Sequence, residues 1–177
     1  FKHRLQVIYD LLDQGEVEHA KDYIQQLQIT QTSRIFVANT NHPIIDAILN
    51  EKYHAAKENS IDISFKVNDL SKLTISTDDL VVLLSNLLDN AIEACQRLPD
   101  NRAIECAVIL EKTLFISIRN TSSPVKIVDG WIKTSKKPEK EHGYGLAGVF
   151  QVLEQLNGEY AMNYADNWFQ FVAEIPI

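Results

Sequence analysis

The sequence predicts an α+β fold, a two-layer sandwich of helices packed on a largely antiparallel sheet, with a helical hairpin in front of it. Segments with the apolar period of a helix are interspersed with short segments in which apolar and polar residues alternate as in strands. The 177 residues are 45% apolar and 23% charged, which is the composition of a folded protein with a substantial core.

The hairpin is expected over residues 1–36, ahead of a single domain over residues 37–177. Apolar residues recur at helical spacing on either side of Gly15. They are Leu5, Ile8, Leu11 and Leu12 before it, and Val17, Ala20, Ile24 and Leu27 after it. Two short helices cannot bury both stripes by themselves. We therefore expect a homodimer, in which two hairpins form a four-helix bundle; the alternative is a hairpin folded back on its own domain.

The elements of the domain follow from local signals such as Pro43 at a helix start and the cap residues Thr77 and Asp78. In chain order they are a helix over 43–59, a strand over 63–67, a helix over 77–98, strands over 103–110 and 113–119, a helix from Gly145, a strand over 159–163 and a strand over 168–175. Residues 121–142 are polar, with two prolines and no steady period. A loop of this length in a compact domain is usually functional.

Charge and cysteine content exclude several classes of protein. The net charge of −7 disfavours binding to nucleic acid or to an anionic membrane surface. Cys95 and Cys106 form no C-x-x-C pair and are expected to be buried, reduced thiols. No apolar run is long enough to span a bilayer.

The helix over 77–98 carries the most informative pattern. Its apolar face is predicted to hold Leu80, Val81, Leu84, Leu87, Leu88, Ala91, Ile92 and Cys95, and its polar face Asn86, Asp89, Asn90, Glu93 and Arg97. Asparagine is a poor helix former, so two asparagines one turn apart indicate a use for amide oxygens. Holding a hard cation such as Mg²⁺ is one such use, and a plain solvated face is the alternative.

Gly143, Gly145 and Gly148 have the G-x-G-x-x-G spacing of a dinucleotide-binding turn. That turn must follow a buried strand directly, whereas the preceding residues 134–142 are polar and contain a proline. The spacing therefore does not predict a dinucleotide site.

Taken together, NLLDNAIEA (residues 86–94) and HGYGL (residues 142–146) resemble the N box and the final glycine box of the GHKL ATPase superfamily, and within it the sensor histidine kinases. The order of helices, strands and long lid is also similar, over residues 40–177. FKHRLQVIYDLL, at residues 1–12, resembles the helix that follows the phosphoacceptor motif in the peptide-sensing and citrate-sensor-like kinases. The resemblance implies a Bergerat-type ATP-binding fold.

Site residues are implied by this resemblance, position by position. Asn90 would hold Mg²⁺, and Asn86 would be the catalytic position near the γ-phosphate of ATP. The glycines would let the backbone approach the phosphates at the positive end of a helix. The remaining ATP-binding residues that it implies are Asn120, Thr134, Ser135, Lys136, His142, Gly143, Gly145 and Leu146.

One of these positions departs from the superfamily pattern. Most members have D-x-G-x-G where this chain has RNTSSP, so that Asn120 stands in place of the aspartate that reads the adenine amino group. An amide oxygen can still accept a hydrogen bond from that group, although without charge assistance.

The resemblance also implies a function. The chain would be the cytoplasmic, ATP-binding part of a membrane-anchored bacterial sensor kinase, which transfers the γ-phosphoryl group of ATP to a histidine for relay to a response regulator. The chain is expected to be a fragment whose phosphoacceptor lies upstream of Phe1, with His3 as the alternative acceptor. Two other functions stay open: a non-catalytic nucleotide-binding module that switches a partner protein, and a serine kinase of the anti-sigma-factor type, which the hairpin disfavours.

Overall fold

The computed structural model describes residues 2–27, 38–125, 132–134 and 144–177. The chain divides into two compact units, Phe1–Ile35 and Phe36–Ile177. In the first unit, helices α1 (Lys2–Asp13) and α2 (Val17–Leu27) are joined by a turn in which Gly15 has a φ of 76°. Residues with a side chain rarely adopt this φ, which explains the glycine between the helices.

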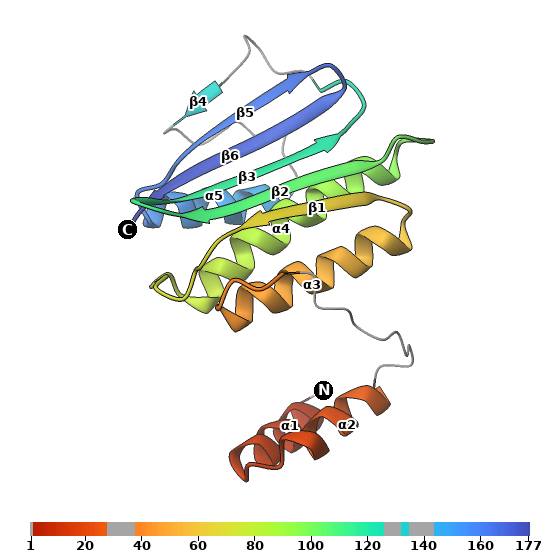
Figure 1. Ribbon diagram of the computed structural model, residues 1–177, viewed down its shortest axis with the longest axis vertical. Coiled ribbons are helices and arrows are strands. Elements are labelled where there is room, and N and C mark those ends of the chain that lie inside the picture. The colour runs from red at the N-terminus through yellow and green to blue at the C-terminus, as the bar shows by residue number, and fades with distance from the viewer. Residues whose placement is uncertain (1, 28–37, 126–131, 135–143) are drawn as a thin grey trace. The chain divides into compact units, whose positions relative to one another are not determined.

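The second unit is an α+β sandwich, as predicted. Its elements are α3 (Pro43–Glu58), β1 (Asp62–Val67), α4 (Thr77–Gln96), β2 (Ala103–Leu110), β3 (Thr113–Thr121), β4 (Ile132–Thr134), α5 (Tyr144–Gln155), β5 (Glu159–Ala165) and β6 (Trp168–Pro176). The strands form one sheet in the order β1-β2-β3-β6-β5-β4. Only the β1–β2 pair is parallel among the described strands. The three helices cover one face of this sheet (Figure 1).

The N-cap of helix α4 lies one residue before the cap residues that the sequence suggests. Ser76 has extended backbone angles, and its Oγ accepts a hydrogen bond from the backbone N–H of Asp79 at 3.2 Å. Ser76, rather than Thr77 or Asp78, is therefore the N-cap. Asp78 and Asp79 lie in the first turn, where their charges complement the positive end of the helix dipole.

The core lies between the helices and the inner face of the sheet. Helix α4 buries Leu80, Leu83, Leu84, Leu87, Leu88, Ala91, Ile92 and Cys95. The prediction was wrong for Val81, which is 40% exposed although the helical period places it between the buried residues Leu88 and Ile92, and Leu83 is buried although it was not assigned to that face. Both cysteines are buried and free, as predicted. Burial raises the pKa of the Cys106 thiol to about 12, so this thiol is unreactive in the folded state.

The structure also differs from the predicted loop over residues 121–142. Residues Ile132–Thr134 form β4, which pairs antiparallel with β5 at the edge of the sheet. A strand of three residues is too short to show an alternating pattern, so only its pairing with β5 defines it. Strand β3 also continues to Thr121. Residues 126–131 and 135–143 lie outside the described part of the chain.

Arg102, between α4 and β2, bonds to the C-terminal ends of two helices. Its Nε and Nη2 donate hydrogen bonds to the carbonyl oxygen of Leu98 at 2.9 and 2.8 Å, and its Nη1 donates to that of Asn59 at 2.9 Å. These carbonyls belong to the unsatisfied ends of α4 and α3, where a positive charge is also favoured by the helix dipoles. The guanidinium therefore ties both helix ends to the start of β2.

Substituting Arg102 with alanine should lower the free energy of unfolding by about 2 kcal/mol, because charge-assisted hydrogen bonds to partly buried carbonyls are lost. Arg102→Lys should recover less than half of this, since an ammonium cannot reproduce the planar fork of donors. Urea denaturation followed by circular dichroism measures the change. Arg97→Ala, at an exposed position at the end of α4, is the control and should cost less than about 0.5 kcal/mol. Equal losses in the Arg97 and Arg102 variants would contradict the assigned role.

Candidate functional site

The polar face of α4 is a ridge that the helix presents away from the core. Asn86, Asp89 and Asn90 are partly exposed, whereas Glu93 and Arg97 are exposed. The Nδ2 atom of Asn90 is buried and has no hydrogen-bond partner among the described residues. An unsatisfied buried donor is costly, and only a hydrogen-bond acceptor such as a phosphate oxygen or a water would complete the bonding of this N–H₂ group.

The N-terminus of α5 lies against this ridge, because α5 packs on α4. A Cβ atom added at Gly145 would lie 3.7 Å from the Cβ, Cγ and Oδ1 atoms of Asn86. At Gly148 it would lie 3.3 Å from Cγ1 of Val82 and 3.7 Å from Nδ2 of Asn86. Gly148 is thus the tighter contact, while Gly145 brings the first turn of α5 next to the Asn86 amide. Free N–H groups and the helix dipole make such a helix start attractive to anions.

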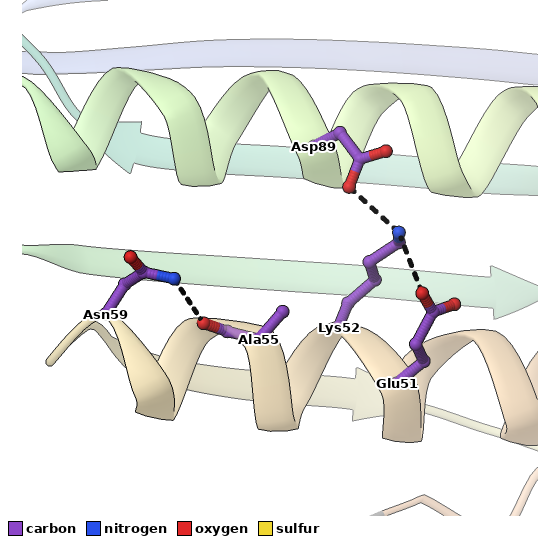
Figure 2. Close-up of polar contacts among 5 residues, drawn as sticks. All are labelled: Glu51, Lys52, Ala55, Asn59 and Asp89. Carbon is purple, nitrogen blue, oxygen red and sulfur yellow. Dashed lines mark hydrogen bonds and ion pairs between the residues drawn. The ribbon is translucent and has the colours of Figure 1, made fainter. Parts of the chain in front are cut away.

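An ion pair between a buried lysine and the half-exposed Asp89 joins the ridge to α3. Lys52 of α3 places its Nζ 2.8 Å from Oδ1 of Asp89 and 3.5 Å from Oε1 of Glu51 (Figure 2). Lys52 lies in line with the buried residues Ile45, Ile48, Leu49 and Ala56 of α3. A lysine in an otherwise apolar helical stripe is visible in the sequence, but sequence reasoning did not single it out.

Asn120 lies on the inner face of β3 and is 2% exposed. Its Nδ2 donates a hydrogen bond to the backbone carbonyl of Thr121 at 3.0 Å. The next residue, Thr121, contacts Cys95 of α4 at 3.6 Å between Oγ1 and Sγ. Asn120 therefore sits where β3 meets the C-terminal part of α4.

A profile of the GHKL domain matches residues 75–176, which is more than half of the chain. The chain belongs to the GHKL domain family. The matched segment runs from the start of α4 to the end of β6, so it contains the ridge, Asn120, α5 and the segment between β3 and α5.

Two curated relatives of this GHKL domain are sensor proteins named CitS. The one from Bacillus subtilis strain 168 is 26% identical over 166 residues, and the one from Halalkalibacterium halodurans is 25% identical over 180 residues. Each alignment covers 89% of this chain and 31% of the relative, so the chain spans about a third of the length of these proteins. The predicted resemblance to sensor kinases of the citrate-sensor-like group is confirmed at the level of the family.

Solved structures show the same fold. The catalytic domain of histidine kinase ThkA matches with a TM-score of 0.62 at 19% identity, over 78% of this chain and 94% of that one. The Acinetobacter baumannii histidine kinase AdeS matches with a TM-score of 0.58 at 16% identity, over 99% of this chain and 92% of that one. At these identities the likeness is one of fold.

The structure brings some of the predicted site residues of this GHKL domain together. Asn86 and Gly145 meet at the contact of α4 with α5, Asn90 lies one helical turn further along α4, and Leu146 packs its half-buried side chain on the core. Thr134 ends β4. Ser135, Lys136, His142 and Gly143 lie outside the described residues, and so does the side chain of His3 on α1.

The residues fit a magnesium–nucleotide complex better than a metal held by protein alone. Within the described residues, no three His, Cys, Asp or Glu side chains form a group that could hold a metal ion. Mg²⁺ commonly keeps several waters and shares phosphate oxygens with one or two protein ligands. Neutral amide oxygens on a ridge beside a helix N-terminus suit such a shared site.

Among the described residues, no helix is long and apolar enough to cross a membrane.

Proposed function

We propose that the second unit binds Mg–ATP on the ridge of α4 and donates the γ-phosphoryl group of ATP to a histidine, for relay to a response regulator. The observation that carries the proposal is the contact of the asparagine ridge of α4 with the N-terminus of α5, where Gly145 lies beside Asn86. The family supports ATP as the ligand. The CitS relatives are sensor proteins, and we propose that this chain is the cytoplasmic part of a membrane-attached sensor kinase.

Each residue has a role that its chemistry allows. Asn90 would hold Mg²⁺ through its amide oxygen, and the ion would supply charge neutralisation for the phosphates. Asn86 is a neutral amide, so it orients the γ-phosphate through hydrogen bonds and does not act as a base. The N–H groups at the start of α5 face the developing negative charge. Asn120 accepts from the adenine amino group through its amide oxygen.

The transfer itself is a displacement at phosphorus. A bond forms between a ring nitrogen of the acceptor histidine and the γ-phosphorus, the bond to the bridging oxygen breaks, and ADP leaves with that electron pair. The ring proton is released to solvent. Because little covalent chemistry falls to the protein, the ridge contributes positioning and electrostatic stabilisation.

The hairpin is proposed to pair with a second copy of the chain. Among the side chains of the hairpin that the structure describes, five large apolar ones are exposed: Leu5, Val7, Tyr9, Leu12 and Val17. Exposed apolar residues gathered on two short helices are typical of a helical-bundle interface. Such a dimer would be formed by the segment that follows the phosphoacceptor motif.

The proposed function predicts that this chain binds ATP but does not label itself with phosphate, because the acceptor histidine lies upstream of Phe1. His3 is one helical turn beyond the acceptor register, about 6 Å along the axis of α1. Incubation with γ-labelled ATP should label only a chain extended upstream, with acid-labile and base-stable phosphate. A nucleotide-binding switch without catalysis would bind ATP and label neither chain. Label on the present chain that disappears in His3→Gln would make His3 the acceptor instead.

A further inference from the structure

Lys52 is the buried cation that the fold alone does not explain. Its side chain is 9% exposed, on the face of α3 that packs against α4. Lysine is almost never buried unless it is paired. Replacing a buried ion pair by apolar residues is often neutral or stabilising, so such a pair is weak evidence for a contribution to stability. Its position beside the ridge suggests a different purpose.

The partner of Lys52 lies in the middle of the proposed nucleotide site. Asp89 directly precedes Asn90, and it is three residues from Asn86, a spacing that makes the two side chains neighbours on the helix surface. The Asp89 side chain is 49% exposed, so its carboxylate borders the surface on which the phosphates would bind. An uncompensated carboxylate there would repel a polyphosphate. Glu51, whose Oε1 is 3.5 Å from the same ammonium, adds a second negative charge.

We propose that Lys52 is a positioning residue for the nucleotide site. Its ammonium neutralises Asp89 and holds the carboxylate on the α3 side of the ridge, so that the triphosphate can approach Asn86 and Asn90 (Figure 2). Lys52 acts through Asp89 and does not touch the nucleotide. The inference rests on the proposed function, because it concerns the binding of Mg–ATP to this ridge.

Variants of Lys52 and Asp89 distinguish a charge role from a structural role. A charge role predicts opposite changes in Mg–ATP affinity for the two variants, whereas a structural role predicts a loss in both. Lys52→Met leaves Asp89 unpaired and should weaken Mg–ATP binding by about fivefold to tenfold, as expected for one unit charge near a partly exposed site. Asp89→Asn removes the repelling charge and should bind Mg–ATP at least as tightly as the wild type. Its thermal midpoint should fall, because the Lys52 ammonium loses its close partner. The double variant Lys52→Met/Asp89→Asn should return to within about twofold of the wild type, because its net charge is that of the original pair.

Isothermal titration calorimetry with Mg–ATP measures the affinities, and thermal denaturation of the same samples measures stability. The deficit of Lys52→Met should shrink as the salt concentration rises, since the unpaired Asp89 carboxylate is half exposed to solvent. Lys57→Met is the matched control, because Lys57 lies on the same helix but is exposed and pairs with Asp62 at 3.4 Å. Its affinity should stay within about twofold of the wild type.

Several outcomes would overturn the inference. One is an affinity of Lys52→Met for Mg–ATP equal to that of the wild type. Another is a loss of Mg–ATP affinity in Asp89→Asn that accompanies its loss of thermal stability. If Lys52→Met does not fold, the Asp89→Asn and double variants decide the question by the same criteria. A wild-type chain that fails to bind Mg–ATP would contradict the proposed function itself, which separates the two failures.

Discussion

Replacing Asn90 with alanine should remove Mg²⁺-dependent ATP binding and leave the domain folded. Loss of a residue that merely supports a metal ligand lowers metal affinity by about 10–100-fold, so loss of the ligand itself should cost at least about 100-fold. The fold should survive because Asn90 lies on the ridge and its Nδ2 makes no hydrogen bond within the described residues. Truncation removes a buried unsatisfied amide, and alanine is the better helix former, so the stability of α4 should rise slightly.

Calorimetry with ATP in the presence and absence of Mg²⁺ measures this effect, and thermal denaturation reports the fold. Gln96→Ala is the matched control, since Gln96 lies on the same helix and its Nε2 donates to Oδ1 of Asn59 at 2.8 Å, away from the ridge. It should lower stability slightly and leave nucleotide affinity unchanged. Unaltered Mg–ATP affinity in folded Asn90→Ala would remove Asn90 from the site.

The ridge could be predicted from sequence because its information is local. A helical period places Asn86 and Asn90 on one face, and the low helix propensity of asparagine separates that face from an ordinary solvated one. The same local logic located most helices and strands, since turn residues and alternation mark them. The assignment of Val81 to the core failed because a helical wheel gives only the direction of a side chain and does not show whether another element covers that part of the helix.

The contacts that hold the ridge in place could not be predicted, because they join segments far apart in the sequence. Lys52 reaches Asp89 only when α3 packs on α4, and Arg102 meets Asn59 only when both helices end at the same side of the sheet. The strand β4 exists only through its pairing with β5. Local propensity carries no record of such partners, so tertiary packing decides them.

Phe171→Ala should produce the largest loss of stability, about 3–5 kcal/mol, because it removes one ring of an aromatic cluster in the core and leaves a cavity. Phe171 is 2% exposed on β6, which lies between β3 and β5. Its ring stacks on Tyr160 with centroids 5.6 Å apart and lies 6.4 Å from Phe150 of α5. The neighbouring rings are fixed by strand pairing and helix packing, so they cannot collapse fully into the space that the side chain leaves.

Chemical denaturation followed by circular dichroism measures this loss, and an unchanged dependence on denaturant concentration would show that stability alone has changed. Phe115→Ala is the control, because Phe115 is the same residue type on the adjacent strand β3, where it is 40% exposed on the outer face of the sheet. That substitution should cost less than about 1 kcal/mol. Saturating Mg–ATP should raise the free energy of unfolding of the folded Phe171→Ala variant, because the ligand binds only the folded state. Equal losses at Phe115 and Phe171 would show that the aromatic cluster beneath α5 is not the centre of the core.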